Sequence, residues 1–188
     1  MAQKRRMAAR RLNRARPALN GIDLEELALR YVGRFATTRA KLATYLKRKL
    51  RERGWEGERE PDPQAIAERM AQLGYIDDGA YALSKSRALT GRGYGPGRVR
   101  QSLRAAGVGE EDAQPAGELA EAERINAALQ FARRRRLGPY SAQAADREDR
   151  QRAVAAMIRA GHGFALSRAI VALEPGSEID IESLCESR

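Results

Sequence analysis

The amino-acid sequence predicts an all-α protein, built as an elongated tandem array of three degenerate three-helix repeats. The first reason is that apolar residues recur at helical spacing in every periodic segment, while no segment shows the alternation typical of a strand. The second reason is that one pattern returns about every 50 residues. Each unit of that size has too few apolar residues to be stable alone, which favours stacked repeats.

The apolar stripes and the capping residues predict each helix in turn. Thr37 or Thr38 and Asp77 are suitable N-caps, and Gly54 and Gly107 are suitable stops. The expected helices cover about residues 23–35, 38–53, 63–73, 78–90, 98–106, 119–135, 147–160 and 164–173, with a weak helical turn around 110–115. Expected core residues include Leu42, Leu46, Met70, Leu73, Val99, Leu103, Ala122, Ile125, Met157, Ile158 and Ile170.

The repeat is visible in two short signatures. Ala-Leu pairs begin at residues 28, 82 and 128, and each is followed by a helix that ends in apolar-x-x-x-Gly, at residues 50–54, 103–107 and 157–161. We therefore expect a basic disordered arm at 1–20, repeats at 21–75, 76–117 and 118–174, and an acidic tail at 175–188.

Composition narrows the possible functions. The 188 residues carry a net charge of +10, are 43% apolar and only 5% aromatic, and include one cysteine and one histidine. An internal disulfide, a cysteine-based zinc site and any mechanism with two histidines are therefore excluded. No apolar run approaches the length of a membrane span, and no secretory signal is present, so we expect a cytoplasmic protein.

Basic residues are concentrated on particular helices. Residues 30–53 contain nine basic residues and one acid, and residues 85–104 contain six basic residues and no acid. Such faces fit a nucleic-acid backbone or a nucleoprotein filament, although a solvated surface is the simpler alternative. Only Tyr94 and Tyr140 are exposed loop aromatics, too few for base stacking to be the main activity. The candidate binding residues are Arg30, Arg34, Lys47, Arg48, Arg51, Lys85, Arg87, Arg92, Arg98, Arg100 and Arg104.

The sequence offers little for catalysis, so we expect no enzyme activity and no cofactor. It has no phosphate-binding loop, H-E-x-x-H or C-x-x-C motif. The alternating glycines of residues 91–97 follow no strand and favour a flexible interhelical loop, in which Pro96 starts the next helix. Asp77 and Asp78 fit a helix cap better than an acid–base pair, and His162 fits a turn after a C-cap glycine. Cys185 has no neighbouring base to activate it.

The middle of the chain carries a distinctive series: Gly74-Tyr75-Ile76-Asp77-Asp78-Gly79-Ala80-Tyr81-Ala82, then Arg87, Gly95, Arg98-Val99, Leu103 and Gly107-Val108. This series resembles the signature of the RecX family, in which a Gly-Tyr-Ile-Asp-Asp turn leads to an aromatic-Ala pair and a basic helix. The match covers the second repeat well and the first reasonably. The third repeat fits by periodicity more than by identity, and it carries a polar insertion near residues 137–150.

The resemblance implies a monomeric regulator of the RecA recombinase. RecX proteins lie in the groove of the RecA filament on single-stranded DNA, and they mainly inhibit strand exchange, ATP hydrolysis and the co-protease activity of the SOS response. The implied partners are the RecA filament and single-stranded DNA, contacted directly or within the filament. Two alternatives remain: a helical DNA-binding protein that acts without RecA, as a helix-turn-helix regulator or architectural factor, and a pure interaction scaffold. The glycine-rich connection at residues 91–97 is longer than the turn of about 3–4 residues that a helix-turn-helix requires.

Overall fold

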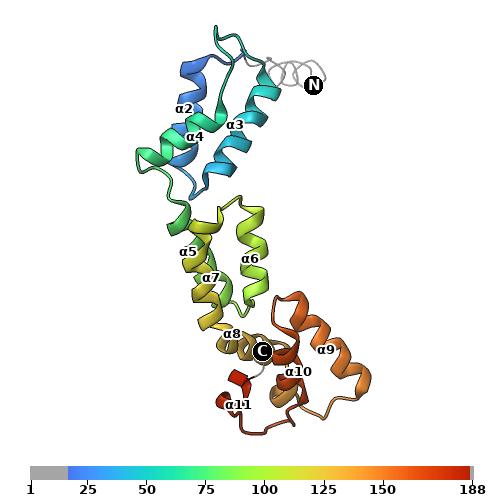
Figure 1. Ribbon diagram of the computed structural model, residues 1–188. Helices are drawn as coiled ribbons and strands as arrows, with labels where there is room; N and C mark the ends of the chain where they lie inside the picture. The colour runs from blue at the N-terminus through green and yellow to red at the C-terminus, as the bar shows by residue number, and fades with distance from the viewer. Residues whose placement is uncertain (1–16, 187–188) are drawn as a thin grey trace, which may run out of the picture. The chain divides into compact units, whose positions relative to one another are not determined.

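The computed structural model describes residues 17–186 and confirms the all-α class (Figure 1). The described residues form ten α-helices, one short 3-10 helix and no strand. The chain divides into two compact units, Met1–Ile76 and Asp77–Arg188. In chain order the elements are α2 (Gly21–Val32), α3 (Arg39–Arg53), α4 (Pro63–Gln72), α5 (Asp78–Thr90), α6 (Pro96–Ala105), α7 (Glu110–Ala122), α8 (Arg124–Arg135), η1 (Gly138–Tyr140), α9 (Arg147–Arg159), α10 (Phe164–Ala172) and α11 (Ile181–Glu186).

The tandem three-helix repeats are confirmed by equivalent residues in equivalent places. The alanine of each Ala-Leu pair is fully buried, in α2, α5 and α8 respectively. Within two residues after the end of the helix that follows, there is in each case a glycine with positive φ: 83° at Gly54, 69° at Gly107 and 94° at Gly161. This backbone conformation favours glycine because a side chain would be strained there. We therefore propose that the repeats are α2–α4 in the first unit, and α5–α7 and α8–α10 in the second.

The first unit packs its three helices around a leucine-rich core. Leu24, Leu42 and Leu46 are almost or fully buried in it, and Thr38 caps α3 as predicted. The end of the expected arm belongs to this core as well. Leu19 is fully buried, and its backbone exchanges hydrogen bonds with the segment after α3 through an isolated bridge to Trp55. The disordered arm expected at 1–20 is therefore wrong for Pro17–Asn20, while residues 1–16 lie outside the described residues.

The second repeat is capped as the sequence predicts. Asp77 is the N-cap of α5, where its Oδ1 accepts a hydrogen bond of 2.7 Å from the amide of Ala80, and Pro96 is the first residue of α6. Ser86 joins α5 to α7, because its buried hydroxyl donates a 2.8 Å hydrogen bond to the carbonyl of Ala116. These contacts fix the ends and the packing of the helices that carry the basic residues.

Replacing Asp77 with alanine should destabilise the second unit by about 1 kcal/mol, because the amide of Ala80 loses its acceptor. Urea denaturation of wild type and variant measures the difference. Asp77→Asn is the matched control, since its amide oxygen can still accept the same hydrogen bond. Equal stability of wild type and Asp77→Ala would contradict the capping role.

The helix prediction around residue 115 is wrong. A weak turn at 110–115 and a long helix from Leu119 were expected, whereas α7 extends from Glu110 to Ala122 with Pro115 inside it, and α8 begins at Arg124. Packing explains this outcome, because Ala116 and Ala120 are fully buried in the core that α7 shares with α5 and α6. The expected border at 117/118 falls inside α7. We propose that the third repeat begins at α8.

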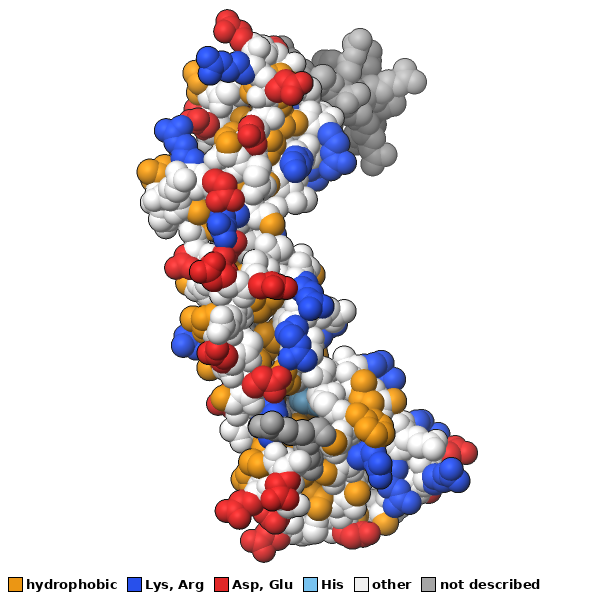
Figure 2. Space-filling view, viewed as in Figure 1, with side chains coloured by type: hydrophobic (Ala, Val, Ile, Leu, Met, Phe, Trp, Pro, Cys, Tyr) orange, Lys and Arg blue, Asp and Glu red, His pale blue; other side chains and the backbone are white. Residues whose placement is uncertain are grey.

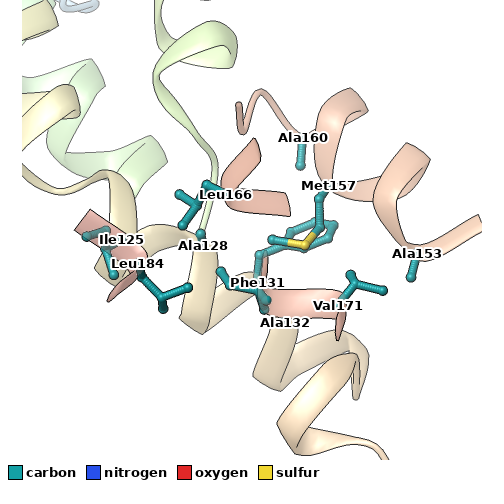
Figure 3. Packing of buried hydrophobic residues seen from close by; sticks show 11 residues of the cluster. Ile125, Ala128, Phe131, Ala132, Ala153, Met157, Ala160, Leu166, Val171 and Leu184 are labelled. Atoms are coloured by element: carbon teal, nitrogen blue, oxygen red, sulfur yellow. The ribbon is translucent and has the colours of Figure 1, made fainter. Parts of the chain in front are cut away.

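The third repeat has the largest cluster of buried apolar residues (Figure 3). Met157 of α9 and Phe131 of α8 point into the same cluster, together with Val171 of α10. Leu184 of α11 also belongs to it, so the segment expected as an acidic tail contains a docked helix. Three expected core residues are wrong. Ile158 is 44% exposed, and Leu73 of the first unit is 59% exposed. Ala122, at the end of α7, is also exposed rather than buried.

A close backbone seam joins the second and third repeats. The amide of Gly95 donates to the carbonyl of Ala160, and the amide of Gly97 donates to the carbonyl of Gly161, both at 2.9 Å. The glycine-rich stretch was expected to be a flexible loop, but these hydrogen bonds fix it against the end of α9. Glycine is required because an added Cβ at Gly95 would meet the backbone of residues 161 and 162.

No helix in residues 17–186 combines the length and the apolarity that crossing a bilayer requires. The same residues contain no group of three or more histidine, cysteine, aspartate or glutamate side chains arranged to hold a metal ion.

Candidate nucleic-acid interface

In the first unit, the predicted basic residues of α3 lie opposite its buried stripe. Leu42 and Leu46 face the core, while Lys47, Arg48 and Arg51 are exposed. This arrangement follows from the rotation of about 100° per residue in a helix. The three cations therefore form an exposed basic strip along α3.

One carboxylate partly neutralises this strip. Glu52 accepts hydrogen bonds from Lys49 at 2.6 Å and from Arg48 at 2.8 Å. The hydrogen bond from Lys49, together with the positive charges of Lys49 and Arg48, holds the pKa of Glu52 below its usual value. Within residues 17–186, no carboxylate lies at ion-pair distance from Lys47 or Arg51. These two side chains remain available to an anionic partner.

The two candidate residues near the end of α2 differ in their surroundings. Arg30 is exposed but pairs with Glu26 at 2.6 Å, one helical turn earlier. Arg34 is exposed beyond the helix, with its guanidinium 5.9 Å from the ring centroid of Phe35. Unlike Arg30, Arg34 therefore has no carboxylate at ion-pair distance within residues 17–186.

In the second unit, α6 carries three exposed arginines, and blue side chains are visible over this part of the molecule in Figure 2. Arg100 and Arg104 are one turn apart and share a face, while Arg98 lies on the other side and donates to Gln101 at 2.7 Å. Arg100 pairs with Glu121 of α7 at 3.1 Å, and Arg104 has no ion-pair partner in the described part of the chain. Exposed pairs of this kind contribute little to stability, so an anion can replace the carboxylate at low cost.

The remaining candidates lie on α5 and the loop after it. Arg87 is exposed and Lys85 is half-buried, and neither forms an ion pair within residues 17–186. Arg92 lies in the loop, with its guanidinium 5.5 Å from the ring centroid of Tyr94.

The structure adds a basic group that the candidate residues did not include. Arg134 of α8 lies 6.0 Å from the ring centroid of Tyr94, and it donates a 2.6 Å hydrogen bond to the carbonyl of Arg92. Arg133 lies 5.7 Å from the ring centroid of Tyr140. Both tyrosines are half-buried beneath arginines rather than free in loops. The run of four arginines at residues 133–136 was the signal in the sequence for this group.

Comparisons with known proteins give a consistent result. Residues 77–116 match the family model for the second three-helix domain of RecX. A regulatory protein RecX from Myxococcus xanthus is 32% identical over 160 residues, which are 81% of this chain and 86% of the relative. A regulatory protein RecX from Thermus thermophilus is 35% identical over 147 residues, which are 77% of this chain and 89% of the relative.

Solved structures support the same fold. One crystal structure of a regulatory protein RecX matches with a TM-score of 0.58 at 24% identity, covering 80% of this chain and 72% of that chain. The crystal structure of RecX from Lactobacillus salivarius matches with a TM-score of 0.56 at 21% identity, covering 79% and 92% respectively. Similarity at this level of identity establishes the fold.

Proposed function

The chain belongs to the RecX family of regulatory proteins, and on that premise we propose that it binds the RecA filament on single-stranded DNA and mainly inhibits it. The inhibited activities are strand exchange, ATP hydrolysis and the co-protease activity. The protein thereby acts in homologous recombination, DNA repair and the SOS response of the cytoplasm. Its role is regulatory rather than catalytic.

The observation that supports this proposal best is a basic strip on each unit, formed by Lys47, Arg48 and Arg51 on α3 and by Arg100 and Arg104 on α6. Lys47 and Arg51 on α3, and Arg104 on α6, are cations without carboxylate partners in the described residues. A filament offers a regular series of DNA phosphates and acidic protein side chains. Binding through cations releases counterions and needs no particular base sequence.

Two separate units increase the affinity of such weak contacts. When one unit has bound, the second is held at high local concentration near its own site on the filament. Each basic strip can therefore be weak alone and still contribute to a stable complex. A protein held at two places along the filament blocks the addition and exchange of RecA subunits, which is how it inhibits ATP hydrolysis and strand exchange.

The deciding experiment measures ATP hydrolysis by the cognate RecA on single-stranded DNA while this protein is titrated. Inhibition at substoichiometric ratios is expected, because one bound molecule interrupts a filament of many subunits. A protein that binds free DNA but leaves the ATPase unchanged would instead be a DNA-binding protein that acts without RecA. A protein with no salt-sensitive contact to DNA or to the filament would be a scaffold.

A further inference from the structure

A cavity of about 410 Å³ lies within the second unit, next to the seam between the second and third repeats. In Figure 2 the pale-blue histidine side chain is visible in this region, among blue and red side chains. We call it the inter-repeat cavity. Its lining residues are Pro96, Arg100, Glu121, Arg124, Gly161, His162, Gly163 and Leu166.

The charged groups of the inter-repeat cavity favour an anion. Two guanidinium groups, Arg100 and Arg124, accompany one carboxylate, Glu121. Arg100 pairs with Glu121 at 3.1 Å, and Arg124 donates to the carbonyl of Cys185 at 2.8 Å. Arg124 therefore uses an uncharged acceptor, and its positive charge is not balanced by these contacts.

The start of α10 adds to the positive potential. Gly163 is the N-cap of this nine-residue helix and lines the cavity, and it has no side chain to accept a hydrogen bond from the first amides. Free amides and the helix dipole make such an end attractive to an anion.

The imidazole of His162 supplies an independent indication of a ligand. His162 is 4% exposed, and its Nε2 lies 3.1 Å from the carbonyl oxygen of Gly93. Because a carbonyl only accepts, Nε2 carries the proton. Nδ1 is buried and has no hydrogen-bond partner in the structure. Nδ1 is therefore an unpaired acceptor, and the ring that lines the cavity can take up a second proton there.

We propose that the inter-repeat cavity binds a phosphate group, held by Arg100, Arg124 and the N-terminus of α10, beside the ring of His162. The phosphate belongs to a nucleic-acid backbone or is free in solution. The first source rests on the proposed function, because the filament carries DNA. The second source does not depend on it.

Binding of the phosphate is coupled to proton uptake. Burial lowers the pKa of His162, although the hydrogen bond to Gly93 acts in the opposite direction, so the free protein holds a neutral imidazole at pH 7. A bound anion close to the ring favours the imidazolium, so the ring takes up a proton at Nδ1 when the phosphate binds. Phosphate should therefore bind more tightly as the pH falls through the raised pKa of the complex.

The single histidine makes this coupling directly measurable. Proton NMR of the ring Cε1–H in the full chain gives the pKa of His162 with and without inorganic phosphate, at matched ionic strength. We expect a saturable increase of about 1–3 pH units, as for an opposite charge placed close to an ionisable group. Arg100→Gln and Arg124→Gln should abolish most of the increase. Arg159→Gln is the matched control, because it removes the same charge from the same unit at an exposed residue of α9 that does not line the cavity.

A loss of phosphate binding can be distinguished from a loss of folding in these variants. The side chain of Arg100 is 57% exposed, so Arg100→Gln is expected to fold even if Arg124→Gln loosens α11. The proposal is overturned if phosphate causes no saturable change in the pKa of His162 in wild type. It is also overturned if the pKa increases as much in Arg100→Gln as in wild type. A single-stranded oligonucleotide that raises the pKa and competes with phosphate identifies the DNA backbone as the source. An oligonucleotide without effect identifies free phosphate.

The same proteins separate this proposal from the proposed function. If wild type inhibits the RecA ATPase but shows no response to phosphate or oligonucleotide at His162, the cavity proposal alone fails. If phosphate raises the pKa of His162 but the ATPase is unchanged, the regulatory proposal alone fails.

Discussion

Replacing Gly95 with alanine is expected to destabilise the second unit by about 3 kcal/mol. The added Cβ would lie against the carbonyl of Gly161 and 2.7 Å from the amide nitrogen of His162. These are backbone atoms, which cannot move away as the end of a flexible side chain can. The seam must therefore open, which weakens the hydrogen bonds from Gly95 to Ala160 and from Gly97 to Gly161.

The matched control for Gly95→Ala is Gly117→Ala in the same unit. Gly117 lies within α7, and an added Cβ would meet nothing within 4 Å. Alanine there should stabilise the helix by about 0.5–1 kcal/mol. Urea unfolding followed through the NMR signal of His162 measures both effects, because this ring lies beside the seam. Equal stability of the two variants would show that the seam is not a tight contact.

Gly95→Ala also tests whether the second and third repeats act together. The inter-repeat cavity takes lining residues from both sides of the seam, including Pro96 and Gly163. Opening the seam should therefore reduce the phosphate response of His162, even under conditions where the second unit stays folded. Gly117→Ala should leave the response unchanged.

The helical repeats were predictable because they depend on local patterns. Thr38 and Asp77 cap the helices that the sequence assigns to them, since capping needs only a side-chain oxygen at the right position. The helix α7 was not predictable in this way. Pro115 and Gly117 both disfavour a helix interior, and the burial of Ala116 and Ala120 against other helices outweighs them.

Contacts between distant residues explain the other differences. Leu19 is buried because it pairs with the segment after α3, and Leu184 is buried because α11 docks on the third repeat. Both residues lie in stretches that are rich in charged side chains. The average composition of such a stretch does not indicate that one leucine in it is buried. The glycine-rich loop was expected to be free because its partners, Ala160 and Gly161, lie more than 60 positions later in the chain.

In the candidate interface, too, features set by local sequence patterns were predictable, and features set by contacts between distant residues were not. Exposure of Lys47, Arg51 and Arg104 follows from helical periodicity and agrees with the sequence. The pairing of Arg100 with Glu121, by contrast, depends on how α6 packs against α7. The buried position of His162 depends likewise on the seam, so its missing hydrogen-bond partner was not visible in the sequence.

Removing three cations from α6 is expected to weaken binding to the RecA filament roughly tenfold at physiological salt. The variant is Arg98→Ala, Arg100→Ala and Arg104→Ala together. Each phosphate contact on single-stranded DNA contributes about 0.7 to the slope of log affinity against log salt, so losing three contacts lowers the slope by about 2. Fluorescence anisotropy with labelled DNA inside the filament, repeated at several salt concentrations, measures both quantities.

A control with the same change of net charge separates position from charge. Arg147, Arg150 and Arg159 are exposed on α9 of the same unit and belong to neither basic strip. Replacing these three with alanine also removes three positive charges, and it should change affinity and salt slope only slightly. If both triple variants lose affinity equally, only the overall positive potential matters, and α6 has no specific role. If neither loses affinity, the arginines of α6 do not bind the filament.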